Sequence, residues 1–414
     1  MNREHGDLLF CDLTQSYAPH GGGGISTYLR EKRRHVIERT GHRLLQIVPG
    51  IEDRIIQDGR HIWAEIAAGP VRGSPNYRFI LRTGAVREVL ARFRPDVIES
   101  QCPWVLPWTA INHRRAFPST VLVAGYHTDF PNAHVGRVGT ELFGKTVARG
   151  LRRLTETYAG VTYREFDRVY TLSSQMRAIL RGYEVPHVDL LDLGVDTDLF
   201  SPTRRDPGFR AALGLSGAGP LLGYAGRIDN ERKADRLIAM MRHLPREFGA
   251  ALVMFGDGKL RDLLAEDARD LRVLLPGFVS DRNELATALA SCDIYVSAMA
   301  DETFGISVIE AQASGLPVVG VASGAMPERV HAGIGLLAQP GDVAAMARHV
   351  QTIWAADPAA MGRAARAHVD GQFSWDRSFG RLFGEVYPKA FSAARDRQRA
   401  ESTGTTGWRP RRAG

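Results

Sequence analysis

The chain has few cysteines and no long apolar run. Its three cysteines, Cys11, Cys102 and Cys292, are odd in number and far apart, so they match neither a zinc site nor a disulfide framework. This pattern suits a reducing cytosol, with the thiols as inert core residues. No stretch approaches the roughly 20 apolar residues of a membrane-spanning helix, and residues 1–13 are too polar for a signal peptide. We therefore expect a cytoplasmic protein, soluble or peripheral on the inner face of the plasma membrane.

The chain also lacks a clustered metal-ligand motif. Its charge balance is basic, with a formal net charge of +7. Such a surplus suggests an anionic partner, which could be a nucleotide, a phosphorylated substrate, a lipid surface or a nucleic acid. With 414 residues, 44% of them hydrophobic, the chain is typical of a globular protein with two domains.

Short apolar runs alternate with helix-period segments along the chain, which predicts an α/β fold with parallel sheets. The candidate strands fall into two sets, at 8–13, 43–49, 95–100, 119–127 and 168–173, and at 221–226, 250–256, 271–279, 293–299 and 317–323. A stretch rich in Gly, Pro, Ser and Asp, residues 193–220, separates the sets. The pattern predicts two Rossmann-like domains facing each other across a cleft, with ligands beyond the carboxyl ends of the strands.

These patterns divide the chain into four parts. Residues 1–195 and 196–372 are expected to form the two Rossmann-like domains. Residues 373–394 are expected to form closing helices that pack back on the amino-terminal domain. Residues 395–414 are basic and lack periodicity, which predicts a disordered tail.

Several loops could hold an anionic ligand. Gly21 to Gly24 precede a helix expected near Ile25, where helix-start amides favour a phosphate, although a flexible turn is the alternative. Arg227, Arg232 and Lys233 follow a predicted strand, and such cations either hold a diphosphate or form a solvated face.

The segment "DETFGISVIEAQASGLPVV" brackets a short apolar run with two acids. Glu302 is expected in a loop after a strand, and Glu310 on the following helix. The amides of Phe304, Gly305 and Ile306 would point out of that helix's start and favour an anion. Because a carboxylate accepts from two vicinal hydroxyls, the two acids suit the sugar and ribose of a nucleotide sugar, with its phosphates at the amides and cations.

This ordered set of motifs resembles the retaining glycosyltransferases of family 4, which have the GT-B fold. The resemblance runs from "GGGGISTYL" through "GVDTDLFSP" and "GYAGRIDNERKADRLI" to "ETFGISVIEAQASGLPVV", about residues 7–385. It implies an enzyme, a metal-independent hexosyltransferase without cofactors, that uses a UDP- or GDP-linked sugar with retention of configuration. The amino-terminal domain would bind the acceptor, and the carboxy-terminal domain the nucleotide sugar.

The resemblance also implies roles for individual residues. Glu302 would contact the donor's sugar hydroxyls, Glu310 the ribose, and His127 the sugar near its reacting carbon, and His127, Glu302 and Arg227 would form the catalytic set. The donor would also meet the backbone at Gly23, Gly24, Phe304, Gly305, Ile306 and Ser307. The family usually has a lysine where this chain has Arg232, with Lys233 one position later, so either residue could join Arg227 at the diphosphate.

Acceptor choice belongs to the amino-terminal half, where "YHTDFP" and the segment after it are similar to family members that glycosylate lipids. Asp129 could act on an acceptor hydroxyl or cap the next segment, and Trp104 could line the acceptor entrance or fill the core. Residues 137–154 predict a basic amphipathic helix, which lies either on an anionic membrane or against the core. Its apolar positions are Leu142, Phe143, Val147, Leu151 and Leu154, and its basic residues are Lys145, Arg149, Arg152 and Arg153.

Three functions are compatible with these patterns. The first is a glycosyltransferase acting on a lipid or envelope glycan. The second is a nucleotide-sugar epimerase or phosphorylase of the same fold. The third is a noncatalytic binder of nucleotide sugars or nucleic acid, but the carboxylate pair argues against nucleic acid because it would repel a phosphate backbone.

Overall fold

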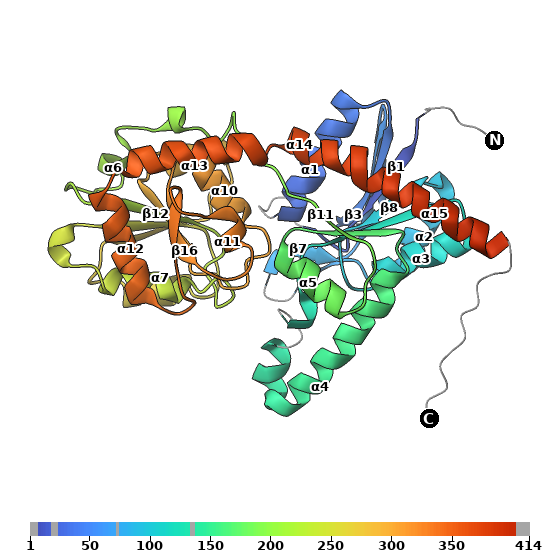
Figure 1. The fold of residues 1–414 in the computed structure, drawn as a ribbon, viewed down its shortest axis with the longest axis horizontal. Helices are drawn as coiled ribbons and strands as arrows, with labels where there is room; N and C mark the ends of the chain where they lie inside the picture. Colours follow the sequence, from blue (N-terminus) through green and yellow to red (C-terminus); the bar gives the residue numbers. More distant parts are fainter. Residues whose placement is uncertain (1–6, 18–23, 72–73, 133–136, 403–414) are drawn as a thin grey trace. The chain divides into compact units, whose positions relative to one another are not determined.

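Figure 1 shows the computed structural model, which describes residues 7–17, 24–71, 74–132 and 137–402. The chain divides into two compact units, with Met1–Leu191 and Phe379–Gly414 in unit 1 and Asp192–Ser378 in unit 2. The domain limits expected from the sequence, after residues 195 and 372, lie a few residues from these divisions. Both units are α/β, as predicted.

Unit 1 contains an eight-stranded sheet with the order β11-β10-β9-β8-β1-β3-β5-β4, in which only the edge pair β4–β5 is antiparallel. Its strands are β1 (Leu9–Leu13), β3 (Arg43–Gly50), β4 (Arg54–Asp58), β5 (His61–Ala67), β8 (Val97–Ser100), β9 (Val121–Tyr126), β10 (Arg168–Thr171) and β11 (Val188–Leu190). A small antiparallel sheet has the order β2-β7-β6, with strands Ser16–Tyr17, Ser74–Phe79 and Gly69–Val71. The strands predicted for this half are confirmed, whereas β4, β5, β11 and the small sheet were not predicted.

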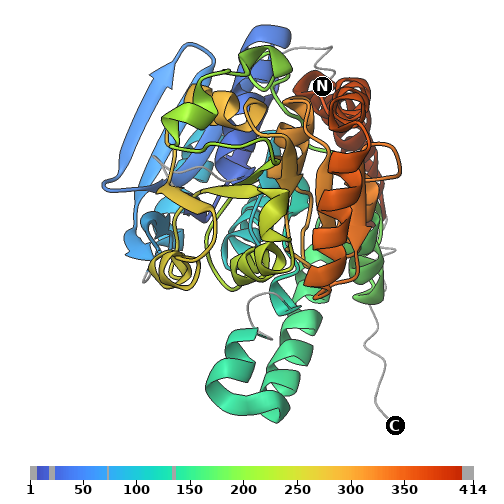
Figure 2. The ribbon, with the colours of Figure 1, turned by 90° about the vertical axis from the view of Figure 1, so that its left-hand side faces the viewer.

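Helices accompany the large sheet of unit 1. They are α1 (Gly24–Arg39), α2 (Thr83–Phe93), α3 (Leu106–Ala116), α4 (Arg137–Arg164), α5 (Ser174–Gly182) and α15 (Tyr387–Ser402). Every residue of β1, β8 and β9 is buried, as expected for parallel strands covered on both faces. Figures 1 and 2 both show α4 extending away from this sheet. None of the described helices combines the length and the apolarity needed to cross a bilayer.

The carboxy-terminal segment corrects one prediction. After α14 (Trp375–Arg381) and a π-helical turn (Leu382–Val386), the chain continues in α15, which packs on β9 and β10. The prediction of disorder from residue 395 onward was wrong for the residues up to Ser402, because the helix continues past the end expected at residue 394. Arg397 holds it to the sheet by pairing with the buried Asp167 at 3.1 Å. The rest of the tail lies outside the described residues.

Unit 2 contains a six-stranded parallel sheet with the order β14-β13-β12-β15-β16-β17. Its strands are β12 (Leu221–Ala225), β13 (Ala251–Phe255), β14 (Val273–Gly277), β15 (Ile294–Val296), β16 (Val318–Val321) and β17 (Gly335–Ala338). Its helices are α6 (Phe209–Ala212), α7 (Ala234–Arg242), α8 (Arg261–Asp267), α9 (Arg282–Ala290), α10 (Ile306–Ala313), α11 (Met326–Arg329), α12 (Val343–Ala355) and α13 (Pro358–Gln372). The predicted strands are confirmed, and β17 is an addition.

The strand order reverses once in each unit, and this places the site. In unit 1 the reversal lies between β1 and β8, and in unit 2 it lies between β12 and β15. At such a point the loops leaving the two strands diverge and leave room for a ligand at the carboxyl edge of the sheet. Ligands are therefore expected at the loops after β1 and β8 in unit 1, and at those after β12 and β15 in unit 2. The three cysteines are buried and free, as expected.

Candidate functional site

Unit 1 has a pocket of about 190 Å³ at the carboxyl ends of β1, β8 and β9. Its lining includes Gly24 at the start of α1, Trp104 after β8, and His127 after β9. The structure therefore brings together three of the residues that the sequence predicted for the site. Gly23, which was predicted with them, lies outside the described residues.

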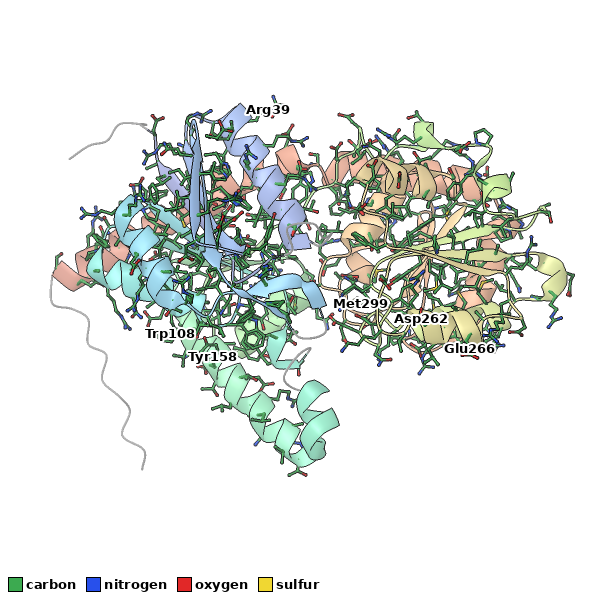
Figure 3. The ribbon with its side chains drawn as sticks, turned by 180° about the vertical axis from the view of Figure 1, so that it is seen from behind. Arg39, Trp108, Tyr158, Asp262, Glu266 and Met299 are labelled. Atoms are coloured by element: carbon green, nitrogen blue, oxygen red, sulfur yellow. The ribbon has the colours of Figure 1, made fainter. Side chains whose placement is uncertain are left out.

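Aromatic side chains form one wall of this pocket. Trp104 and Phe130 both line it, with their ring centroids 5.4 Å apart, and Trp104 also packs against the core. Trp108 on α3 and Tyr158 on α4, both partly buried, lie side by side (Figure 3). Trp104 thus lines the pocket and also packs against the core, while its role at an acceptor entrance stays a prediction.

Asp129 is not among the residues that line the pocket. Its Oδ1 accepts hydrogen bonds from the hydroxyls of Tyr126 at 3.3 Å and Tyr183 at 3.4 Å. These bonds tie the loop after β9 to the core. The position of Asp129 therefore favours the structural alternative over action on an acceptor hydroxyl.

His127 presents a neutral imidazole at the pocket. Burial lowers its pKa to about 4, and the opposing charge of Glu99 does not offset this. Nε2 of His127 meets Oε1 of Gln101, a residue that also lines the pocket. Gln101 was not predicted as a site residue from the sequence, although its position as a polar residue directly after an apolar strand indicated one. At neutral pH the ring can form hydrogen bonds but carries no positive charge.

Glu302 lies in the loop after β15, where it contacts both a cation and a backbone amide. Its Oε2 lies 2.8 Å from Nη1 of Arg232, and its Oε1 accepts from the backbone N–H of Gly305 at 3.1 Å. Gly305 has a left-handed φ of 89°, which favours glycine, and directly precedes α10. Arg232 also contacts the sulfur of Met299, which Figure 3 labels at the start of this loop. The Gly305 amide, expected to face an anion, is therefore bonded to Glu302 in this structure.

The neighbouring cations of the loop after β12 differ in their surroundings. Arg232 is the one that pairs with Glu302, whereas Lys233 is exposed. Lys233 also has a left-handed backbone, with φ 54° and ψ 39°, at the start of α7. Arg227 is half exposed and pairs with two acids of its own loop, Asp229 at 2.5 Å and Glu231 at 2.9 Å. Of the three, only Arg232 is brought to a predicted donor-binding acid.

Glu310 is buried on α10 and pairs with an arginine that the sequence did not single out. Its Oε1 lies 2.6 Å from Nη2 of Arg282, the first residue of α9. The Arg282 guanidinium lies over the ring of Phe200, 4.7 Å from its centroid. Its position could have indicated it, because Arg282 follows β14 and therefore lies among the loops at the carboxyl ends of the strands, as Arg232 does.

Phe304 is contacted by a buried arginine at both its carbonyl and its ring. Arg329 donates from Nε to the Phe304 carbonyl at 3.1 Å, and its guanidinium carbon lies 4.2 Å from the ring centroid of Phe304 and 5.0 Å from that of Phe373. Asp192 supplies a counter-charge at 3.3 Å. The loop between Glu302 and α10 is therefore fixed by the core of unit 2. Ile306 and Ser307, the first residues of α10, are half-buried.

Comparison with known proteins agrees with this architecture. The chain is 28% identical over 377 residues to a GDP-mannose-dependent alpha-(1-6)-phosphatidylinositol dimannoside mannosyltransferase of Mycobacterium tuberculosis, covering 90% of this chain and 94% of that protein. It is 27% identical over 335 residues to a GDP-mannose-dependent alpha-mannosyltransferase of Corynebacterium glutamicum, covering 78% and 75%.

Solved structures share the fold. Sucrose-phosphate synthase from Thermosynechococcus elongatus has a TM-score of 0.75 at 22% identity, covering 93% of this chain and all of that one. Anabaena HepE in complex with UDP-glucose has a TM-score of 0.67 at 19% identity, with coverage of 93% and 100%. The model of Glycosyltransferase Family 4 matches residues 22–199, and that of Glycosyl transferases group 1 matches residues 219–356. The chain therefore belongs to the glycosyltransferases of family 4 and has the GT-B fold.

Proposed function

We propose that this glycosyltransferase moves a hexose from a nucleotide sugar to a lipid or envelope-glycan acceptor at the cytoplasmic surface of a membrane, with retention of configuration. The cluster of Arg232, Glu302 and the start of α10 carries this proposal. It combines a cation for phosphate, a carboxylate for sugar hydroxyls and the N-terminus of a helix within hydrogen-bond distance. GDP-mannose is the first donor to test, because several relatives are GDP-mannose-dependent mannosyltransferases.

Glu302 can serve the donor without losing its present contacts. A carboxylate has about four acceptor positions, and Arg232 and the Gly305 amide take one each. The remaining positions are available for vicinal sugar hydroxyls. Arg232 has further N–H donors for a phosphate oxygen, so one arginine can bridge the sugar-binding acid and the diphosphate.

The proposed reaction exchanges one bond at the anomeric carbon for another on the same face. The bond from this carbon to the leaving diphosphate oxygen breaks, and the acceptor oxygen forms the new glycosidic bond. The acceptor proton moves to the leaving diphosphate, whose growing negative charge is stabilised by Arg232, with Arg227 joining if it leaves its acidic neighbours. No protein nucleophile and no metal ion are assigned a step, and Glu302 acts by binding hydroxyls.

The pocket of unit 1 suits the sugar or acceptor end of the reaction. Its wall of Trp104 and Phe130 offers apolar surface, while His127 offers a neutral hydrogen-bonding group. Hydroxyl-bearing ligands combine such faces with polar edges. We assign Trp104 to acceptor binding and leave Asp129 as a structural residue.

The amphipathic helix supports a membrane acceptor. Val147, Leu154 and Val161 on α4 are 50%, 67% and 46% exposed, and a spacing of seven residues places them on one side of the helix. Arg149 and Arg153 are exposed nearby. The alternative of a core-packed helix therefore does not hold for Val147 and Leu154. The side chains of Leu142, Phe143 and Lys145 lie outside those described.

Vesicle binding tests the membrane part of the proposal. The protein should sediment with vesicles containing anionic phospholipid and should bind less to neutral ones, because basic residues add to apolar burial. Leu154→Glu should reduce this binding. Equal binding of both proteins to anionic vesicles, or none by either, contradicts the membrane role of α4.

A thermal-shift screen over GDP-mannose, UDP-sugars and ADP-sugars tests the donor. A ligand that binds only the folded protein raises its melting temperature, so one nucleotide sugar should stabilise the protein. With that donor, His127→Ala should lower turnover while the fold stays intact. Stabilisation by no nucleotide sugar contradicts the proposal, and donor turnover that needs free phosphate but no acceptor points to a phosphorylase.

A further inference from the structure

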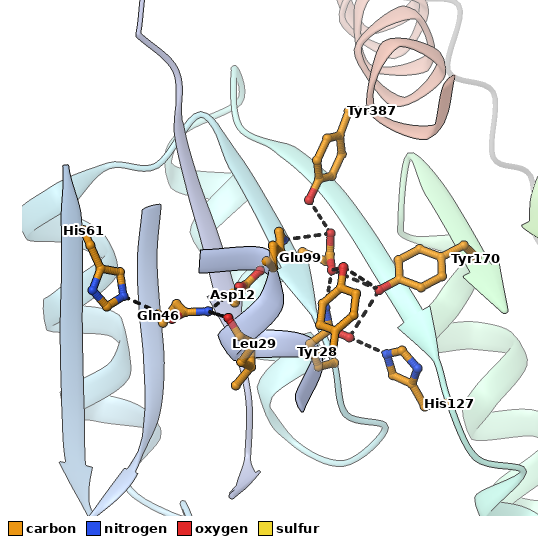
Figure 4. A network of polar contacts seen from close by, with 11 residues as sticks. Asp12, Tyr28, Leu29, Gln46, His61, Glu99, His127, Tyr170 and Tyr387 are labelled. Atoms are coloured by element: carbon orange, nitrogen blue, oxygen red, sulfur yellow. Dashed lines mark hydrogen bonds and ion pairs between the residues drawn. The ribbon is translucent and has the colours of Figure 1, made fainter. Parts of the chain in front are cut away.

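Glu99 at the end of β8 is a buried carboxylate that accepts hydrogen bonds from several directions (Figure 4). Tyr28 and Tyr170 donate to its Oε1 at 2.6 and 2.9 Å, and Tyr387 donates to its Oε2. Nζ of Lys32 lies 3.2 Å from Oε2. Burial alone would raise the pKa of Glu99, but Lys32 and the hydroxyls outweigh it and lower the pKa. Glu99 is therefore ionised at neutral pH and can only accept hydrogen bonds.

Gln101 has its side-chain amide oriented by this carboxylate. Nε2 of Gln101 donates to Oε1 of Glu99. The reversed amide would place its oxygen against an ionised carboxylate, where neither group could donate. The amide oxygen consequently faces the other way, toward Nε2 of His127, and lies 3.3 Å from the oxygen of the Tyr170 hydroxyl, whose hydrogen goes to Glu99.

This arrangement determines the tautomer of His127. The Gln101 oxygen can only accept, so Nε2 of His127 must carry the hydrogen that joins them. With its pKa lowered to about 4 by burial, the ring holds a single hydrogen at neutral pH, and Nδ1 keeps a lone pair. Among the described residues Nδ1 has no hydrogen-bond partner, and the residue lines the pocket.

Gly125 on β9 supplies the space in which these groups meet. A Cβ at this position would lie 2.5 Å from Nε2 of His127, 2.7 Å from the Tyr170 hydroxyl and 2.8 Å from Oε1 of Gln101. Such distances are far shorter than ordinary packing contacts, so a larger residue would force the histidine and glutamine apart. Glycine at position 125 of the strand is therefore required for the contact between His127 and Gln101.

A second carboxylate, glutamine and histidine in unit 1 are connected in the same way. Gln46 donates from Nε2 to Oδ2 of Asp12 at 2.9 Å, while its Oε1 meets Nε2 of His61 at 3.1 Å (Figure 4). Lys32 pairs with both Asp12 and Glu99, so the two sets share one cation. His61 is not among the residues that line the pocket, which makes this set a control within the same unit.

We propose that Gln101 is a positioning residue that holds His127 in the tautomer with Nε2 protonated, so that Nδ1 offers the pocket a hydrogen-bond acceptor. Glu99 enforces this state by fixing the direction of the Gln101 amide.

The consequence for catalysis rests on the proposed function. His127 accepts a hydrogen bond from a hydroxyl of the bound sugar or acceptor, and it does not act as a proton donor. The pocket therefore distinguishes a ligand with a hydroxyl at that point from one that lacks it. The unaltered protein should bind a deoxy analogue that lacks this hydroxyl more weakly than the parent ligand. Substitution of Gln101 should not change the affinity for that analogue.

The tautomer can be measured without any ligand. Two-bond ¹⁵N–¹H correlations of histidine-labelled protein at neutral pH distinguish the two tautomers and the imidazolium, and loss of signals in His127→Asn assigns the residue. We expect hydrogen on Nε2 alone in the unaltered protein. Gln101→Met, which keeps the side-chain length but removes the amide, should shift His127 toward the other tautomer. Gln46→Met should change the signals of His61 and leave those of His127 unchanged.

Kinetics provide the second readout. Loss of one oriented hydrogen bond predicts a decrease in kcat/KM of roughly tenfold for Gln101→Met, against less than about twofold for Gln46→Met. The proposal is overturned if His127 in the unaltered protein is protonated on Nδ1 or on both nitrogens, or if Gln101→Met changes neither spectrum nor kinetics. Should Gln101→Met not fold, the spectrum of the unaltered protein still decides. Absence of transfer with every donor refutes the proposed function, while the spectrum judges the tautomer independently.

Discussion

The cluster around Lys32 in unit 1 and the pairs of Glu302 and Glu310 in unit 2 hold buried carboxylates in different ways. In unit 1, Lys32 lies between Asp12 and Glu99, and none of the three side chains is more than 1% exposed. Burial alone would lower the pKa of Lys32, but the two acids outweigh it and raise the pKa. This cluster is enclosed by its own partners and has no access to a ligand except through the chain from Glu99 to His127.

In unit 2 the carboxylates are buried but their cations reach solvent. Glu302 is 7% exposed and Glu310 5% exposed, whereas their partners Arg232 and Arg282 are 29% and 30% exposed. An arginine that is partly hydrated can turn a second N–H toward a phosphate without leaving its carboxylate.

This difference distinguishes ion pairs that stabilise the fold from ion pairs that can rearrange to bind a ligand. A buried pair with no solvent contact is costly to break, because the remaining charge has no partner. A pair at the carboxyl edge of a sheet, with one partly exposed member, can rearrange at a smaller cost. Removing one charge from each kind of pair tests this distinction.

The largest expected effect is that of Lys32→Met on stability. The change leaves Asp12 and Glu99 buried together without a cation, which should destabilise the protein by about 3–5 kcal/mol and lower its melting temperature by roughly 6–20 °C. Scanning calorimetry measures this. The control is Lys389→Met, since the Lys389–Asp189 pair is exposed and should contribute no more than about 1 kcal/mol. Equal melting temperatures for both variants would show that the unit 1 cluster is not a folding element.

The next effect concerns turnover in unit 2. Arg232→Met should lower kcat on the order of 100-fold, because it removes the charge proposed to stabilise the leaving diphosphate. Its matched control is Lys233→Met, one position along, where the exposed side chain predicts a change of less than about twofold. Steady-state kinetics with the donor found by thermal shift make the comparison. A larger loss in Lys233→Met would reverse the assignment of the phosphate-binding cation.

A smaller effect concerns the pH dependence of stability. Burial lowers the pKa of His61 to about 4, so as pH falls from 7 the unfolded chain binds a proton before the folded one does. Stability from this group is complete above the unfolded pKa near 6.5 and is lost as pH falls toward 4, by about 2 kcal/mol between pH 7 and 5. His61→Gln should flatten the decline in melting temperature over this range. An unchanged decline would contradict the contribution of His61.

Much of the fold could be predicted because strands buried on both faces are continuous apolar runs. The β4–β5 hairpin escaped because β4 is exposed throughout and shows no such run. The continuation of α15 escaped for another reason. Its basic residues without periodicity predicted a disordered tail, whereas Arg397 pairs with a buried acid, Asp167, 230 positions away in the sequence.

The site could be predicted where a motif carries it and not where contacts depend on tertiary structure. Glu302 and Glu310 were predicted from one local segment, and the structure shows both buried and paired with arginines. Arg282 and Arg329 were missed because each reaches its partner from a different helix, which residue spacing does not reveal. Gln101 was detectable only as a polar residue after an apolar strand, and its partner His127 comes from the next strand along the chain.

The smallest effect concerns nucleotide binding at Glu310. Glu310→Ala should weaken the affinity for the donor about tenfold with little change in kcat, because the carboxylate is proposed to hold the ribose and takes no part in bond exchange. Calorimetric titration with the donor measures the dissociation constant, and Glu284→Ala, at an exposed acid on α9, is the control. Because Arg282 loses its partner in this variant, Arg282→Met separates the two effects. If both variants weaken binding equally, the ion pair rather than the carboxylate is responsible, and if neither does, the assignment of Glu310 to the ribose is wrong.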